Sequence, residues 1–173
     1  MMRKLLIIFF VATVCSTAQS ESFVDMSYNK LTDLPDGVNV DGYSIMYASV
    51  DDNLTLKAGG MVVDVTDDNG YGIRDAAATF GGMIGMQSFA TGTLYAGADL
   101  ALVDGDSDTS VSIGYSKQKV DEFSYDLSIS HSDGESVFGV TIRIPVANGG
   151  GLLIGVADTD LSRVFNIGYS FGF

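Results

Sequence analysis

The last ten residues, Val164-Phe165-Asn166-Ile167-Gly168-Tyr169-Ser170-Phe171-Gly172-Phe173, alternate strictly between apolar and small or polar side chains. Successive side chains of a β-strand point to opposite faces, so this segment predicts a strand with two different faces. One face carries Phe165, Ile167, Tyr169, Phe171 and Phe173, and the other carries Asn166, Gly168, Ser170 and Gly172.

The same two-residue period recurs along the chain, in segments bounded by Asp, Asn, Gly and Ser. In 94–102, leucines and alanines alternate with Tyr95, Gly97 and Asp99, and 123–129 shows the same pattern. No stretch after residue 20 has the apolar run of a transmembrane helix. The first and ninth segments are the weakest, and an eight-stranded count follows if they fail. We predict an all-β, closed antiparallel barrel of ten strands at 22–30, 40–50, 53–64, 76–87, 93–103, 110–119, 123–131, 136–145, 151–158 and 164–173.

Composition favours an all-β protein with an acidic surface. The chain has 21 Gly and 2 Pro, and only 18% of its residues are charged against 46% hydrophobic. Each interior Gly costs a helix about 1 kcal/mol relative to Ala. The 22 acidic residues exceed the 9 Lys and Arg, which gives a net charge of −13. A field of that sign repels nucleic acid and anionic lipid headgroups, so we expect neither as a direct partner.

The first twenty residues are typical of a cleavable secretion signal. Arg3 and Lys4 precede an apolar run, 5–12, that is too short to span a bilayer. Small residues predict cleavage after Ala18 or Ser20, which leaves residues 21–173 as one barrel domain. The single cysteine, Cys15, lies inside the signal, so the mature chain has no disulfide framework.

The connections between the predicted strands alternate in character. Short turns are expected at 51–53, 118–122 and 148–150. Longer or more acidic loops are expected at 31–39, 64–75, 104–109, 132–135 and 158–162. Short turns on one rim and longer loops on the other are typical of bacterial outer-membrane barrels. An even number of strands places both termini at the short-turn rim, which is the periplasmic one.

The non-apolar face indicates which side of the wall meets lipid. It consists mostly of Gly, Ser, Thr and Ala, with isolated charges at Lys57, Asp99, Asp126 and Arg143. Such a face is too poor in Lys and Glu for a water-exposed sheet, whereas small side chains fit the lumen of a narrow barrel. The apolar face then meets lipid, and its aromatic residues near strand ends match an interfacial girdle.

Over most of the mature chain, the sequence resembles the small outer-membrane β-barrel proteins of the kind grouped with outer membrane proteins A and X. The terminal strand that ends at Phe173 is the most specific element, and 42–45 with 54–60 resembles the early hairpin of that family. The resemblance implies a cell outer-membrane location in a Gram-negative bacterium. It also implies contact with lipid and lipopolysaccharide, delivery by periplasmic chaperones, and recognition of the last strand by barrel-assembly machinery. It implies no reaction and no cofactor.

Candidate chemistry is sparse. His131 is the only histidine, beside Ser132 and Asp133, and no lipase or protease motif accompanies it. We therefore expect a histidine at a loop edge, with an enzyme centred on His131 as the least favoured function. Asp104, Asp106 and Asp108 alternate as weak candidate metal ligands. Thr109 and Tyr115 stand where a calcium loop needs Gly and Glu, so solvated acidic loops are the favoured interpretation.

The charges expected in the lumen allow two functions. Lys57 and Arg143 with Asp99 and Asp126 either line a narrow pore for small solutes or ions, or pair and plug the interior. Buried charges are costly unless paired, which favours the plug. The predicted role is therefore that of a structural or surface-interaction protein with acidic outer loops. The narrow pore is the alternative.

Overall fold

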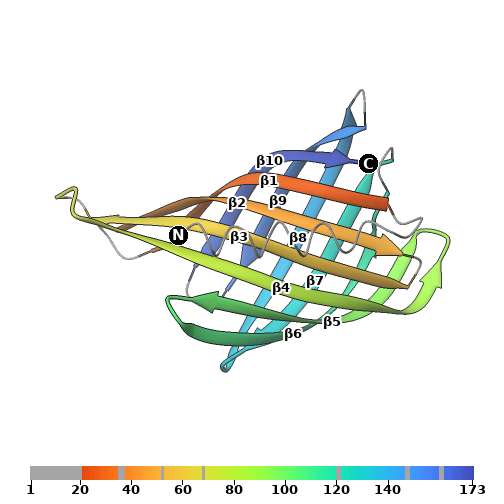
Figure 1. The fold of residues 1–173 in the computed structure, drawn as a ribbon, viewed down its shortest axis with the longest axis horizontal. Helices are drawn as coiled ribbons and strands as arrows, with labels where there is room; N and C mark the ends of the chain where they lie inside the picture. The colour runs from red at the N-terminus through yellow and green to blue at the C-terminus, as the bar shows by residue number, and fades with distance from the viewer. Residues whose placement is uncertain are drawn as a thin grey trace.

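In the computed structural model the chain forms a closed antiparallel β-barrel (Figure 1). The ten strands of the described part of the chain follow one another around the ring in chain order, and the first pairs with the last. This confirms the predicted ten-stranded barrel, and the eight-stranded alternative is wrong. The predicted secretion signal, its cleavage site and Cys15 lie outside the described residues. The structure describes residues 21–34, 38–51, 53–67, 69–119, 122–146, 149–159 and 162–173.

The strands differ from the predicted segments by at most four residues at any end, at the starts of β4 and β6. Both weakly patterned segments form strands. Among the described residues, no helix has the length and hydropathy to cross a membrane. The strands are β1 (Glu21–Thr32), β2 (Val38–Asp51), β3 (Leu54–Asp67), β4 (Gly72–Phe89), β5 (Gly92–Val103), β6 (Asp106–Lys117), β7 (Ser124–Ser132), β8 (Glu135–Val146), β9 (Gly150–Asp158) and β10 (Arg163–Gly172).

The ring closes where β1 meets β10. The register between them runs from Phe23 opposite Gly172 to Thr32 opposite Arg163. Beyond it, Ser22 and Phe173 exchange two backbone hydrogen bonds, N to O, of 3.0 Å each. Closure leaves no free sheet edge along the paired length of these strands, so their backbone donors and acceptors are satisfied within the wall. We call this β1–β10 contact the closing seam.

The two faces of each strand separate as the sequence predicts. On β10, Phe165, Ile167 and Phe171 point outward, and Ile167 remains 55% exposed. On the other face, Ser170 is only 1% exposed because it lies inside the ring. β5 repeats this division, with its leucines outside and Tyr95 inside, 3% exposed. The apolar surface of this protein is therefore its exterior, and the small and polar side chains are its interior.

The acidic connections expected at 104–109 and 132–135 are shorter than predicted. β5 and β6 are joined by Asp104 and Gly105 alone, and β7 and β8 by Asp133 and Gly134. All four residues have positive φ, at 49°, 101°, 46° and 87°. Two consecutive residues with positive φ make the tight type I′ hairpin turn, for which Asp-Gly is a preferred pair. The acidic residues that follow Gly105 and Gly134 belong to strands instead of loops.

β3 and β4 form the hairpin that extends furthest from the barrel, at the end away from the C-terminus (Figure 1). Pairing between β4 and β5 begins only at Ala77 with Val103, so β4 has β3 alone as neighbour over residues 72–76. The Asp67 carboxylate fixes the tip by accepting hydrogen bonds of 2.9 Å from the backbone N–H groups of Asn69 and Tyr71. The expected loop 64–75 is therefore mostly paired strand.

Gly168 offers a test of how tightly the closing seam is packed. A Cβ added there would lie 2.0 Å from the backbone oxygen of Met26 on β1. We expect Gly168→Ala to lower the free energy of unfolding in urea by about 1–3 kcal/mol, because the backbone has to move apart. Gly139→Ala is the matched control, since its added Cβ meets only the movable Ser128 hydroxyl, at 3.0 Å. Equal stability of both variants would contradict a tight seam.

Candidate functional site in the barrel lumen

Small polar side chains line the middle of the lumen. Ser27 and Ser44 face each other across β1 and β2 with their hydroxyl oxygens 2.7 Å apart, and Asn29 donates to the Ser44 hydroxyl at 3.0 Å. On β9 and β10, the Asn166 amide lies where a Cβ on Gly155 would sit, 2.6 Å from Oδ1. That buried oxygen has no hydrogen-bond partner. The lumen wall thus offers hydroxyl and amide groups on a glycine-lined surface.

Near the rim that holds the termini, four side chains project into the lumen and contact one another. Arg143 donates from Nη2 to both oxygens of Asp25, at 3.0 and 2.8 Å, and from Nε to the Ser170 hydroxyl at 2.6 Å. Its guanidinium lies 4.3 Å from the centre of the Phe23 ring, a cation–π distance. The Phe23 side chain is almost completely buried, at 1% exposure. We call Phe23, Asp25, Arg143 and Ser170 the lumen plug.

A second contact crosses the lumen at the same end. The Tyr95 hydroxyl on β5 lies 3.1 and 3.0 Å from the two Asp126 oxygens on β7 and donates to this carboxylate. The tyrosine ring passes over Gly114 of β6, where an added Cβ would lie 2.4 Å from its hydroxyl oxygen. Gly114 is therefore the residue that lets Tyr95 reach Asp126.

The other two charges predicted to lie in the lumen, Lys57 and Asp99, stand in register with each other on β3 and β5. Lys57 is opposite Gly81, and Gly81 is opposite Asp99. The Asp99 carboxyl lies against Gly81 so closely that an added Cβ would meet Oδ1. All four residues named from the sequence, Lys57, Asp99, Asp126 and Arg143, lie on the lumen face. The closest ionic partner of Arg143 is Asp25, which sequence reasoning missed because its neighbours in β1 alternate less clearly.

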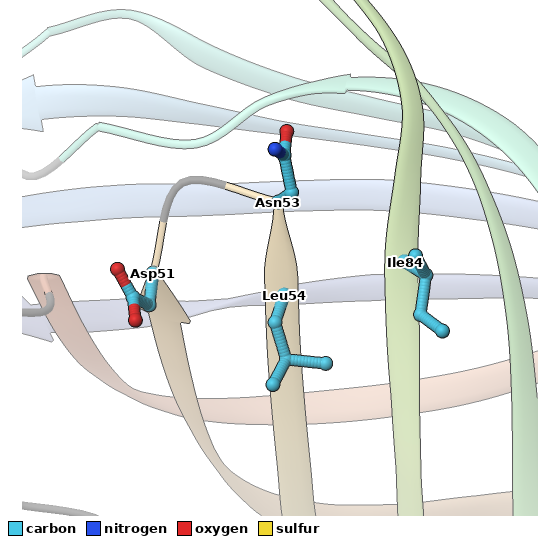
Figure 2. Close-up of a pocket in the computed structure, with 4 residues that line it drawn as sticks. All are labelled: Asp51, Asn53, Leu54 and Ile84. Carbon is cyan, nitrogen blue, oxygen red and sulfur yellow. The ribbon is translucent and has the colours of Figure 1, made fainter.

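The mouth of the lumen at the terminal rim is a cavity of about 420 Å³. Met83 and Tyr95, 5% and 3% exposed, lie at its inner end, and Asp51, Lys117 and Lys119 stand around it. A second depression, of about 430 Å³, opens on the wall beside this rim, where Figure 2 shows Asp51, Asn53, Leu54 and Ile84. Its two apolar side chains are exposed on the exterior, so it offers no convergent set of polar groups for a substrate.

The opposite rim, which we call the outer rim, is strongly acidic on its lumen-facing side and in its turns. No Lys or Arg of the described residues shares this side. Asp108 accepts a hydrogen bond of 2.6 Å from the Ser132 hydroxyl. The described residues contain no group of three or more His, Cys, Asp or Glu that could hold a metal ion, and Asp104, Asp106 and Asp108 form none. The acidic residues are Asp33, Asp67, Asp75, Asp104, Asp106, Asp108, Asp133 and Glu135.

His131 lies outside the lumen. It stands opposite Val111, a residue of the exterior face, and its ring Nδ1 is 3.2 Å from the Ser136 hydroxyl. Both residues are exposed. Neither Ser132 nor Asp133 is hydrogen-bonded to the imidazole, although they follow it in sequence. Among the described residues, the contacts of His131 therefore include no nucleophile–base–acid arrangement.

Comparison with known proteins finds likeness to solved structures alone. No family model matches the chain, and no curated protein matches it. Among solved structures, it is similar to the KdgM porin in complex with disordered oligogalacturonate, with 7% identity, 89% of this chain and 99% of that chain covered, and a TM-score of 0.48.

Two further solved structures are similar. The β-domain of the Bordetella autotransporter BrkA has 11% identity, 90% and 100% coverage, and a TM-score of 0.45. A triple mutant of the Rhodopseudomonas blastica porin has 16% identity, 80% and 52% coverage, and a TM-score of 0.37. These likenesses assign no family, ligand or activity to this chain.

The lumen plug yields a direct test. Arg143→Met leaves the Asp25 carboxylate inside the lumen without its cation, and we expect a loss of about 2 kcal/mol in the free energy of unfolding. This is less than the roughly 3–5 kcal/mol of a fully buried pair, because both side chains keep some exposure. Asp25→Asn combined with Arg143→Met should recover most of the loss, since no uncompensated charge remains. A double-mutant cycle measures the coupling, and additive effects would show that the two residues do not act as a pair.

Proposed function

We propose that the protein is an integral outer-membrane β-barrel with a closed lumen, and that its role is structural or one of surface interaction at the acidic outer rim. The lumen plug carries this proposal. Phe23, 1% exposed, is held between the wall and the Arg143 guanidinium, and Asp25 neutralises that cation. A lumen filled in this way leaves the outer rim as the surface available for function.

The exterior supports the placement in a membrane. Ile113, Ile129 and Ile167 project outward from three different strands with 49%, 53% and 55% exposure. Soluble proteins rarely expose contiguous apolar patches of more than a few hundred Å². Tyr169 and Phe171, whose rings are 4.7 Å apart, lie near the terminal rim, where an aromatic girdle belongs.

The orientation follows from the termini. Both ends of the barrel meet at one rim, which we assign to the periplasm, so the acidic rim faces the outside of the cell. We further propose the partners that the terminal strand implies: periplasmic chaperones, barrel-assembly machinery that binds Phe165 to Phe173, and outer-membrane lipid with lipopolysaccharide. Membership of the group of outer membrane proteins A and X is part of the same proposal.

A narrow pore is the second candidate. The serine, glycine and asparagine lining of the middle lumen favours it, because such a wall accepts water and small polar solutes. We propose no enzymatic function, since the exposed His131 imidazole contacts a serine hydroxyl on the exterior and no carboxylate.

Conductance distinguishes the closed barrel from the pore. In a planar bilayer we expect no steady single-channel steps from the unmodified protein. Phe23→Ala, which empties the centre of the lumen plug, should give frequent openings. Phe165→Ala removes the same side chain from the exterior and should stay silent. Steady conductance by the unmodified protein would overturn the closed lumen and favour the pore.

A charge on the exterior tests the membrane placement. Ile167→Arg should cost about 2–4 kcal/mol of unfolding free energy in lipid vesicles, because the guanidinium enters hydrocarbon. Thr109→Arg adds the same charge to the same face near the outer rim, where the cost falls to about 0–1 kcal/mol. Equal effects of the two substitutions, or a protein that stays monomeric in buffer without detergent, would exclude the membrane assignment.

A further inference from the structure

Most of the described acidic residues of the outer rim face the lumen or lie in its turns, but Asp41, Asp64 and Asp158 stand on the exterior beside its basic residues. The acidic residues of the strand ends and turns described above point toward the lumen or lie in the turns. The Lys and Arg residues described at this rim are Lys30, Arg74 and Arg163, and each stands on the exterior face. Lys30 is opposite the exposed Phe165, and Arg74 is opposite Asp64, which stands two residues beyond the exterior Val62. Every cation at this end therefore meets the surroundings of the barrel.

Lys30 makes no ion pair with any described residue. Its neighbour across β1 and β2 is Asp41, but that carboxylate accepts a hydrogen bond of 2.8 Å from the Tyr28 hydroxyl. The ring centres of Tyr28 and Tyr43 lie 5.4 Å apart on the same face. This pair is two residues from Lys30 and Asp41 along the strands, on the side away from the outer rim. Lys30 thus stands on the exterior two residues along β1 from an aromatic pair, and it forms no ion pair with a described residue.

Arg163 stands beside Lys30 on the closing seam. Thr32 is opposite Arg163 and Phe165 is opposite Lys30, so the two cations are diagonal neighbours on one face. Such neighbours are about 7–8 Å apart. Arg163 donates to Asp158 through Nε, and this salt bridge leaves its Nη groups for a second acceptor. Arg74 differs, because Nε and Nη2 both bind the Asp64 carboxylate, at 2.6 and 2.8 Å.

We propose that Lys30 and Arg163 form an exterior site for a phosphate group of lipid A. The site rests on the proposed outer-membrane placement. A guanidinium and an ammonium are the side chains suited to phosphate, the first by its fork of N–H groups and the second as a compact charge. Below them, Phe165, Ile167 and Met26 are 47%, 55% and 47% exposed and offer an apolar wall for acyl chains.

Two cations beside an exposed apolar wall favour a phosphorylated lipid over other ligands. A soluble anion would gain the two cations but would leave the apolar wall unused, whereas a neutral lipid would use the wall and leave Lys30 without a counter-charge. A phosphorylated lipid in the outer leaflet satisfies both. The repulsion of anionic lipid expected from the net charge of −13 does not extend to the exterior of this rim, where Lys30, Arg74 and Arg163 balance the charges of Asp41, Asp64 and Asp158.

The test uses the protein purified from its membrane in a neutral detergent, with diphosphoryl lipid A as probe and lipid A without its phosphates as comparison. We expect the unmodified protein to bind the diphosphoryl form and to bind the dephosphorylated form much more weakly, as measured by native mass spectrometry. Lys30→Gln and Arg163→Gln should each weaken binding about fivefold, the contribution of one cation near a charged lipid surface. Lys119→Gln removes the same charge at the opposite rim and should leave binding unchanged.

Equal binding of both lipids would overturn the phosphate site. So would a loss of binding in Lys119→Gln as large as in Lys30→Gln, since any positive charge would then suffice. Heat-modifiable migration on gels reports barrel folding separately. A folded, bilayer-inserted protein that fails the lipid comparison refutes the phosphate site alone, whereas failure to insert refutes the outer-membrane function.

Discussion

The rest of the structure depends on the requirement that every backbone donor and acceptor in an apolar medium be paired within the wall. Hydrocarbon offers no water to an unpaired N–H or C=O group, so an open sheet cannot be tolerated there. The pairing of β1 with β10 satisfies the two strands that would otherwise be edges. Once the ring is closed, each side chain faces either the lumen or the exterior. The two-residue period of the sequence then decides the chemistry of both surfaces.

Closure also limits what fits inside. The long side chains of Arg143 and Tyr95 enter the lumen only because glycine or other small residues lie beside them. Gly114 allows the Tyr95 ring to pass, and Gly81 makes room for the Asp99 carboxyl. The abundance of glycine thus follows from a narrow bore that has to hold a few functional side chains. In this protein, glycine supplies volume in the lumen more often than it supplies turns.

The strands were predictable because alternation is a local property. In β5, β7 and β10 the apolar or polar character of each residue predicts whether its side chain faces the exterior or the lumen, and the structure confirms the prediction. The turns at Asp104 and Asp133 were also readable, since Asp-Gly is a strong hairpin signal, but the acidic residues around them favoured loops. The partner of Arg143 could not be predicted. Asp25 is 118 residues away, and only the closed ring brings β1 and β8 close together, with β10 and β9 between them. Which pair of charges meets depends on how the strands are staggered around that ring.

If the acidic rim faces the outside of the cell, as proposed above, its two Asp-Gly turns affect how proteases and antibodies meet the protein. With β5 joined to β6, and β7 to β8, by two residues each, these tips offer no extended segment that could enter the active-site cleft of a protease. Their backbones are held by the hairpins on either side. At these two hairpins the connecting backbone is short and held in place by the strands, so it resists digestion and offers an antibody little mobile chain to bind.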